Sequence, residues 1–140
     1  MHEVIPNRLW IGNAVEARDI RRLLDLGVAA LVDLAIEELP SGLIRELVYC
    51  RIPLIDGSSN PPERLRLAVE TLVALIRQGM PTFVFCGAGM SRSPAITAAA
   101  LAVVEGADAN TVLQRIVAGI PHDVSPALWQ EVTACLQALD

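Results

Sequence analysis

The segment from Thr82 to Glu105 constrains the fold more than any other stretch of the chain. Residues 82–86 form a short run of aromatic, β-branched and cysteine residues, which predicts a buried strand. Residues 95–105 are almost entirely Ala, Leu, Val and Ile, which predicts a buried helix. The tight loop between them contains Gly87 and Gly89. A strand, a glycine-containing loop and a helix N-terminus in this order form an arrangement that binds anions through backbone N–H groups and the helix dipole.

Three side chains give this loop a possible chemistry. Cys86 lies at the start of the loop, where the N–H groups that would bind a phosphate would also stabilise a thiolate. Arg92 carries a planar guanidinium, which can bind two oxygens of a phosphoryl group at once. Ser93 places a hydroxyl beside the loop, in position to donate to the thiolate. The residue types therefore predict a nucleophilic cysteine in a phosphate-binding loop.

The sequence Cys-Gly-Ala-Gly-Met-Ser-Arg-Ser-Pro resembles the signature of the cysteine-dependent, dual-specificity-type protein phosphatases, Cys-x-x-Gly-x-x-Arg followed by Ser or Thr. The resemblance implies that Cys86 is the nucleophile, that Arg92 binds phosphate, and that Ser93 aids breakdown of the phosphoenzyme. It also implies that loop amides form the rest of the cradle, from Gly87, Ala88, Gly89, Met90, Ser91 and Arg92. The chain departs from the family at Phe85, where a histidine is usual.

The second informative stretch is the loop of residues 53–62, because catalytic groups often lie on loops held by a rigid scaffold. Asp56 follows a predicted strand here, and its position resembles that of the family's general acid. Such an acid is required because the leaving oxygen must gain a proton. By local sequence alone, Asp56 fits a turn residue before Gly57 equally well. The downstream signature favours the catalytic interpretation.

The order of elements predicts an α/β fold: a mostly parallel central sheet flanked by helices on both faces, with residues 1–140 as a single phosphatase-like catalytic domain. Besides residues 82–86, strands are expected at 4–5, 9–11, 28–34 and 47–52, and the segment 36–46 is ambiguous because Pro40-Ser41-Gly42 interrupts it. Further helices are expected at 14–26, from 61 with Asn60 as its N-cap, at 108–118 and from 126 onward.

The amino-acid composition limits the classes of partner that are expected. The net charge is −5 and all 11 cationic residues are arginines without a basic run, so neither nucleic acid nor an acidic membrane surface is an expected partner. No apolar stretch predicts a membrane span and no secretory signal is recognised. Three cysteines without a framework spacing indicate a cytoplasmic protein. Neither histidine has a second ligand at a useful spacing, so no metal is expected.

The favoured interpretation is a phosphomonoester hydrolase without a cofactor, which acts on phosphotyrosine, with or without phosphoserine and phosphothreonine, through a cysteinyl-phosphate. The alternative is a binding module that recognises phosphorylated ligands without turnover, because Phe85 replaces the usual histidine. Another thiol chemistry would need a resolving cysteine, for which only Cys50 and Cys135 are available. A disulfide between Cys50 and Cys86 is a minor further hypothesis. The substrate is then a phosphorylated protein or a small phosphomonoester, and the oligomeric state stays open.

Overall fold

The computed structural model describes residues 1–38 and 45–137. The strands are β1 (His2–Ile5), β2 (Leu9–Asn13), β3 (Ala30–Ala35), β4 (Val48–Leu54) and β5 (Thr82–Cys86). The helices are α1 (Ala14–Ala17), α2 (Ile20–Asp25), α3 (Pro62–Arg77), α4 (Arg92–Glu105), α5 (Ala109–Val117) and α6 (Pro126–Gln137). The interruption expected at Pro40-Ser41-Gly42 lies outside the described residues.

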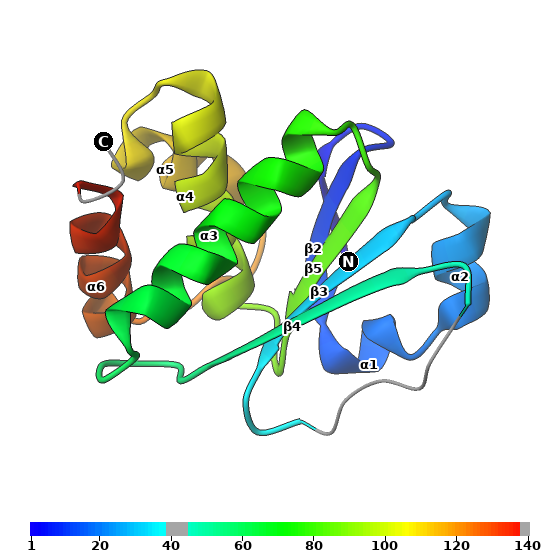
Figure 1. Ribbon diagram of the computed structural model, residues 1–140, viewed down its shortest axis with the longest axis horizontal. Coiled ribbons are helices and arrows are strands. Elements are labelled where there is room, and N and C mark those ends of the chain that lie inside the picture. The colour runs from blue at the N-terminus through cyan, green and yellow to red at the C-terminus, as the bar shows by residue number, and fades with distance from the viewer. Residues whose placement is uncertain (39–44, 138–140) are drawn as a thin grey trace.

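The five strands form one sheet in the order β1-β2-β5-β3-β4. Strand β1 pairs antiparallel with β2, whereas the β2–β5, β5–β3 and β3–β4 pairs are all parallel. The signature strand β5 is therefore central, and β2 and β3 flank it (Figure 1). This arrangement confirms the predicted α/β fold with a mostly parallel sheet, and it brings the carboxyl ends of four parallel strands to one edge.

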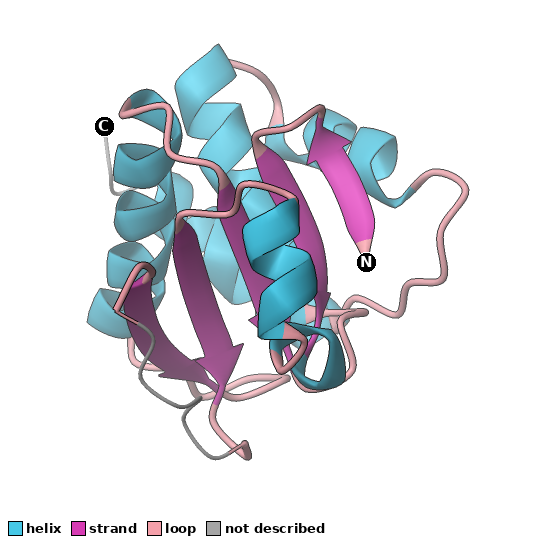
Figure 2. Ribbon diagram, turned by 90° about the vertical axis from the view of Figure 1, so that its right-hand side faces the viewer, coloured by secondary structure: helices cyan, strands magenta, loops and turns pink. Residues whose placement is uncertain are grey.

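Helices cover both faces of the sheet (Figures 1 and 2). Side chains of β5 alternate between two cores: Val84 and Cys86 pack with residues of α3, α4, α5 and α6. Phe83 and Phe85 pack on the opposite face with residues of α1 and α2. The apolar run is continuous because both faces of a parallel strand are buried. Helix α4 lies at the centre of the larger core, and all its residues from Arg92 to Ala102 are buried.

Two local predictions were wrong. The helix expected at 14–26 is two short helices, because Asp19 accepts a hydrogen bond from the Arg22 N–H and begins α2 as its N-cap. Asn60 does not cap α3, whose N-cap is Pro61. The Asn60 side chain instead binds the backbone of Ile55 and Gly57. The predicted cap at Asp108 is confirmed, since its carboxylate accepts from the N–H of Thr111 at 2.9 Å.

Within the described residues, no helix is both long enough and apolar enough to span a bilayer.

Candidate active site

Six of the predicted site residues line a small pocket at the carboxyl edge of the sheet, whereas Gly87, Gly89 and Ser93 are not among its lining residues. Cys86 ends β5, and Asp56 lies just beyond the end of β4. The pocket has a volume of about 70 Å³, and it is lined by Asp56, Cys86, Ala88, Met90, Ser91, Arg92 and Asp123. Asp123 was not predicted, and it reaches the pocket because its N–H donates to the Met90 carbonyl at 2.9 Å. The structure thus brings Asp56, Cys86 and Arg92 together across more than thirty residues of sequence.

Glycine is required at position 89 because the loop passes close to the neighbouring strand. Gly89 has φ +76°, and a Cβ atom there would lie 2.7 Å from the backbone carbon of Gly12. The loop is also tied to the end of β2, since the Ala14 N–H donates to the Gly87 carbonyl at 3.3 Å. The loop geometry therefore depends on the pairing of β2 with β5.

Ser91 leaves the N-terminus of α4 available to a ligand. It occupies the N-cap position, but its side chain does not cap the helix. The Ser91 hydroxyl instead donates to Oδ1 of Asp56 at 2.6 Å and accepts from the Ser125 N–H at 2.9 Å. The first N–H groups of a helix have no intrahelical partner, so an uncapped start can bind an anion. Ser91 also links this helix start directly to Asp56.

Ser93 lies beside the cysteine. Its Oγ is 3.4 Å from the Cys86 sulfur and 3.4 Å from the Gly12 carbonyl oxygen. Both Cys86 and Ser93 are almost completely buried, with relative exposures of 2% and 0%. The hydroxyl donates to the Gly12 carbonyl in this structure, so its single proton can go to the sulfur only in place of that bond.

Glu37, which follows β3, pairs with Arg92 and was missed by the sequence analysis. Nη1 of Arg92 donates to Oε2 of Glu37 at 2.7 Å and to the Leu54 carbonyl at 2.8 Å, while Nη2 donates to Oε1 of Glu37. The Nε nitrogen is buried and has no hydrogen-bond partner among the described residues. Glu37 lies in a segment without a recognisable pattern, so no sequence signal identifies it.

The pairing shifts the pKa values of both partners. Burial opposes the charge of Arg92, but the hydrogen bond to Glu37 and the charges of Cys86, Glu37 and Asp56 raise its pKa above the ordinary value. The hydrogen bond from Arg92 lowers the pKa of Glu37 below its ordinary value. Arg92 is therefore a permanent cation beside Cys86.

Phe85, which occupies the position of the family's usual histidine, is a core residue. It is 2% exposed and stacks on Phe83 with a centroid separation of 5.6 Å. Its side chain lies on the α1–α2 face, whereas Cys86 faces the other core. A cysteine at this site would therefore rely on the loop N–H groups, the helix dipole, Arg92 and Ser93 for thiolate stabilisation.

The other cysteines lie away from the pocket. Cys50 is level with Val84, because both pair with Val32, and it lies two strands from β5. Two strand spacings of about 4.8 Å exceed the Cα separation of roughly 4.4–6.8 Å that a disulfide needs. The hypothesis of a Cys50–Cys86 disulfide is therefore wrong for this structure. Burial raises the pKa of the thiols of Cys50 and Cys135, and all three cysteines are free.

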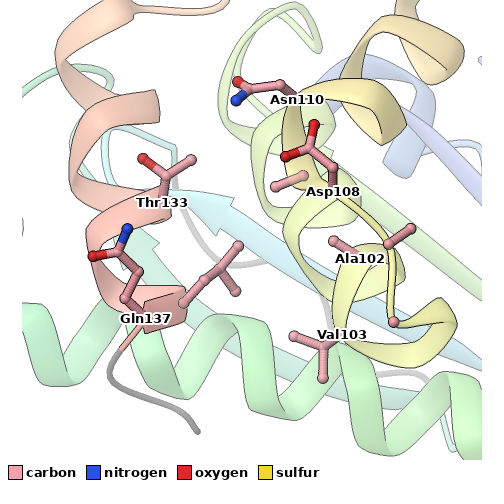
Figure 3. A pocket seen from close by; sticks show the side chains of 10 residues that line it. Ala102, Val103, Asp108, Asn110, Thr133 and Gln137 are labelled. Carbon is pink, nitrogen blue, oxygen red and sulfur yellow. The ribbon is translucent and has the colours of Figure 1, made fainter.

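A larger hollow of about 480 Å³ lies elsewhere, between the ends of α4 and α6 and the start of α5 (Figure 3). Its labelled side chains are small, apolar or amide groups, with Asp108 as the one acid among them, and that carboxylate is engaged by Thr111. Its lining contains no cysteine, histidine or arginine. Across residues 1–38 and 45–137, no group of three or more His, Cys, Asp or Glu side chains could hold a metal ion.

Known proteins share both the sequence and the fold. The human dual specificity protein phosphatase 15 is 29% identical over 119 residues, which cover 84% of this chain and 39% of that protein. The crystal structure of DUSP15 matches 99% of this chain and 88% of its own with a TM-score of 0.80 and 26% identity. That of human DUSP28 has a TM-score of 0.84 and 23% identity over 99% and 97% of the two chains. No protein-family model matches the chain.

The Cys-x5-Arg loop between a buried parallel strand and a buried helix fits the resemblance to the cysteine-dependent phosphatases. In sequence and in fold, this chain is similar to dual-specificity protein phosphatases. The chain spans between 39% and 51% of the length of the curated relatives that it matches.

Substitution of Gly89 by alanine should disrupt the loop more than the same change at a matched glycine. Gly119 has almost the same dihedral, φ +78°, but a Cβ atom added there would meet nothing within 4 Å. Gly119→Ala should cost only the left-handed strain of about 1–2 kcal/mol. Gly89→Ala adds a backbone clash, so its free energy of unfolding, measured in urea, should fall by more than that of Gly119→Ala. Equal losses would contradict the close approach of the loop to β2.

Removal of the Glu37 charge should destabilise the fold in a pH-dependent way. Because the folded-state pKa of Glu37 is depressed, its stabilisation is present above its ordinary pKa of 4.5 and is lost as the pH falls through the lower folded value. Glu37→Gln should therefore lower the unfolding midpoint at pH 7, and the difference from wild type should shrink below pH 4.5.

Glu38→Gln is the matched control for Glu37→Gln. Glu38 pairs with Arg18, whose side chain is 62% exposed, so this surface pair should contribute roughly 0–1 kcal/mol. A midpoint difference for Glu37→Gln that is no larger than for Glu38→Gln, or that does not change with pH, would contradict the assigned pairing.

Proposed function

We propose that residues 1–140 form a single catalytic domain that hydrolyses phosphomonoesters of proteins through a cysteinyl-phosphate. The observation that carries this proposal is the buried, unpartnered Nε of Arg92, a residue that lines the same pocket as Cys86 and Asp56. A buried donor without a partner costs about 1–3 kcal/mol, so a ligand oxygen that accepts from it would bind favourably. Similarity to the dual-specificity phosphatases supports phosphoryl groups as that ligand.

In the first step the Cys86 thiolate attacks phosphorus in line with the leaving oxygen. Arg92 and the N–H groups of the loop from Gly87 to Arg92 stabilise the equatorial oxygens, and such preorganised electrostatic stabilisation is usually the largest catalytic contribution. Asp56 donates its proton to the leaving alkoxide or phenoxide as the S–P bond forms and the P–O bond breaks.

In the second step water attacks the phosphocysteine, Asp56 takes the proton from that water, and the thiolate leaves as inorganic phosphate forms. Ser93, with Oγ 3.4 Å from the sulfur, donates to the departing thiolate. The overall reaction consumes one water molecule and needs no cofactor.

The preferred substrates are phosphotyrosine proteins, with phosphoserine and phosphothreonine proteins as the broader class that the family's name implies. The free thiols of Cys50, Cys86 and Cys135 support a reducing, cytoplasmic location for this activity. The acidic net charge supports neither nucleic acid nor acidic membranes as partners.

A pH–rate profile for p-nitrophenyl phosphate tests the nucleophile and the acid together. Cys86→Ser should lower kcat/KM by at least about 10⁴-fold, because the covalent route is lost. Asp56→Asn should lower the rate by about 10²–10⁴-fold and remove the basic limb of the profile, since that limb reports loss of the acid's proton.

The matched controls are Cys135→Ser and Asp25→Asn, which change a remote thiol and an exposed carboxylate. Full activity in Cys86→Ser would refute the proposal. Phosphate binding by wild type without any turnover would instead support a non-catalytic phospho-ligand module, in which Phe85 accompanies an inactive cysteine.

A further inference from the structure

Helix α6 contacts the Asp56 loop and the Cys86 loop at the same time. The carboxylate of Glu131 accepts hydrogen bonds from the backbone N–H of Ser59 at 3.0 Å and of Asn60 at 3.3 Å. One and a half turns earlier, the Ser125 N–H donates to the Ser91 hydroxyl, which in turn donates to Asp56. A single helix and the residue before it therefore hold both ends of the Asp56 loop.

The hydrogen bonds inside the Asp56 loop set its shape but not its position. The Asn60 side chain accepts from the Ile55 N–H at 2.8 Å and donates to the Ile55 and Gly57 carbonyls at 2.9 and 3.2 Å. All these partners belong to the loop itself, so they would move with it. Only contacts to other elements can fix the Asp56 carboxylate relative to Cys86, and Glu131 and Ser91 supply such contacts.

The backbone of Ser59 has an unfavourable conformation, which indicates that the contact with Glu131 helps to hold the loop in its shape. Ser59 is a non-glycine residue at φ +74°, a left-handed conformation that costs roughly 1–2 kcal/mol. Such conformations persist only where the surroundings enforce them. The Ser59 N–H is one of the two donors to Glu131, and hydrogen bonds to a charged acceptor are about twice as strong as neutral ones.

We propose that Glu131 is a positioning residue for catalysis: through Ser59 and Asn60, and together with the Ser91 contact, it fixes Asp56 above Cys86. The inference rests on the proposed function. In this proposal the Asp56 loop already holds the general acid in its working position before substrate binds, and it does not close over the substrate as a lid.

A positioning role for Glu131 predicts a dependence on the leaving group. Phenol, with a pKa near the value of about 10 for tyrosine, needs a proton from the acid more than p-nitrophenol does, because the nitro group stabilises the phenoxide. A displaced Asp56 therefore slows hydrolysis of phenyl phosphate more than that of p-nitrophenyl phosphate. General loss of folded protein would lower both rates by the same factor.

The experiment compares kcat/KM, which reports the step that releases the leaving group, for the two esters in wild type, Glu131→Ala, Glu131→Gln and Asp56→Asn. We expect Glu131→Ala to lower kcat/KM for phenyl phosphate about tenfold more than for p-nitrophenyl phosphate, since small misplacements of catalytic groups cost up to about 10²-fold. Glu131→Gln keeps one oxygen acceptor and should lie between wild type and Glu131→Ala. In the Asp56→Asn background, Glu131→Ala should not change the ratio of the rates for the two esters any further.

Glu70→Ala removes a carboxylate from an exposed position on α3 and is the matched control. Thermal unfolding of each variant measures its folded fraction. If Glu131→Ala does not fold, the comparison of Glu131→Gln with wild type still tests the inference. Equal losses on both esters, or a Glu131 profile identical to that of Glu70→Ala, would overturn the inference while the proposed function stands. Activity that is independent of Cys86 would instead refute the proposed function itself.

Discussion

A buried guanidinium holds the carboxyl edge of the sheet together. Arg92 begins α4, and its side chain binds Glu37 after β3 and the carbonyl of Leu54 at the end of β4. A cation with only 5% exposure is stable there because a carboxylate and a carbonyl accept its hydrogen bonds. Arg92 also lines the pocket of Cys86, and its buried Nε has no hydrogen-bond acceptor among the described residues. The interaction that organises the fold therefore also prepares the anion site.

The topology explains how this pairing becomes possible. In the order β2-β5-β3-β4 all neighbouring pairs are parallel, so residues that follow each strand gather at one edge. Gly12, Glu37, Asp56 and Cys86 reach that edge from four separate strands. Ligand sites at the carboxyl ends of parallel strands are the general rule for open α/β sheets. Helix α6, through Glu131, and Ser125 just before it then hold the Asp56 loop from outside the sheet.

Much of this could be predicted from sequence because the informative signals are local. The continuous apolar run of β5, the two glycines and the uninterrupted apolar helix predict strand, loop and helix from neighbouring residues alone. Asp56 could be predicted only with the downstream signature, since locally it fits a turn equally well. Asn60 looked like a helix cap, but its side chain makes three hydrogen bonds within the Asp56 loop, which outcompete the cap. Glu37 and Glu131 were missed because a single glutamate in an ordinary polar pattern gives no indication of its tertiary partner.

The central claim is that Cys86 carries the phosphoryl group between the two steps. Rapid acid quench of the protein during turnover of an aryl phosphate, followed by peptide mapping by mass spectrometry, tests it directly. The account predicts one added phosphoryl group on the peptide that contains Cys86, and none on the peptides that contain Cys50 or Cys135. Turnover with no phosphoryl group on Cys86 at any quench time, or with the group on another residue, would contradict the account.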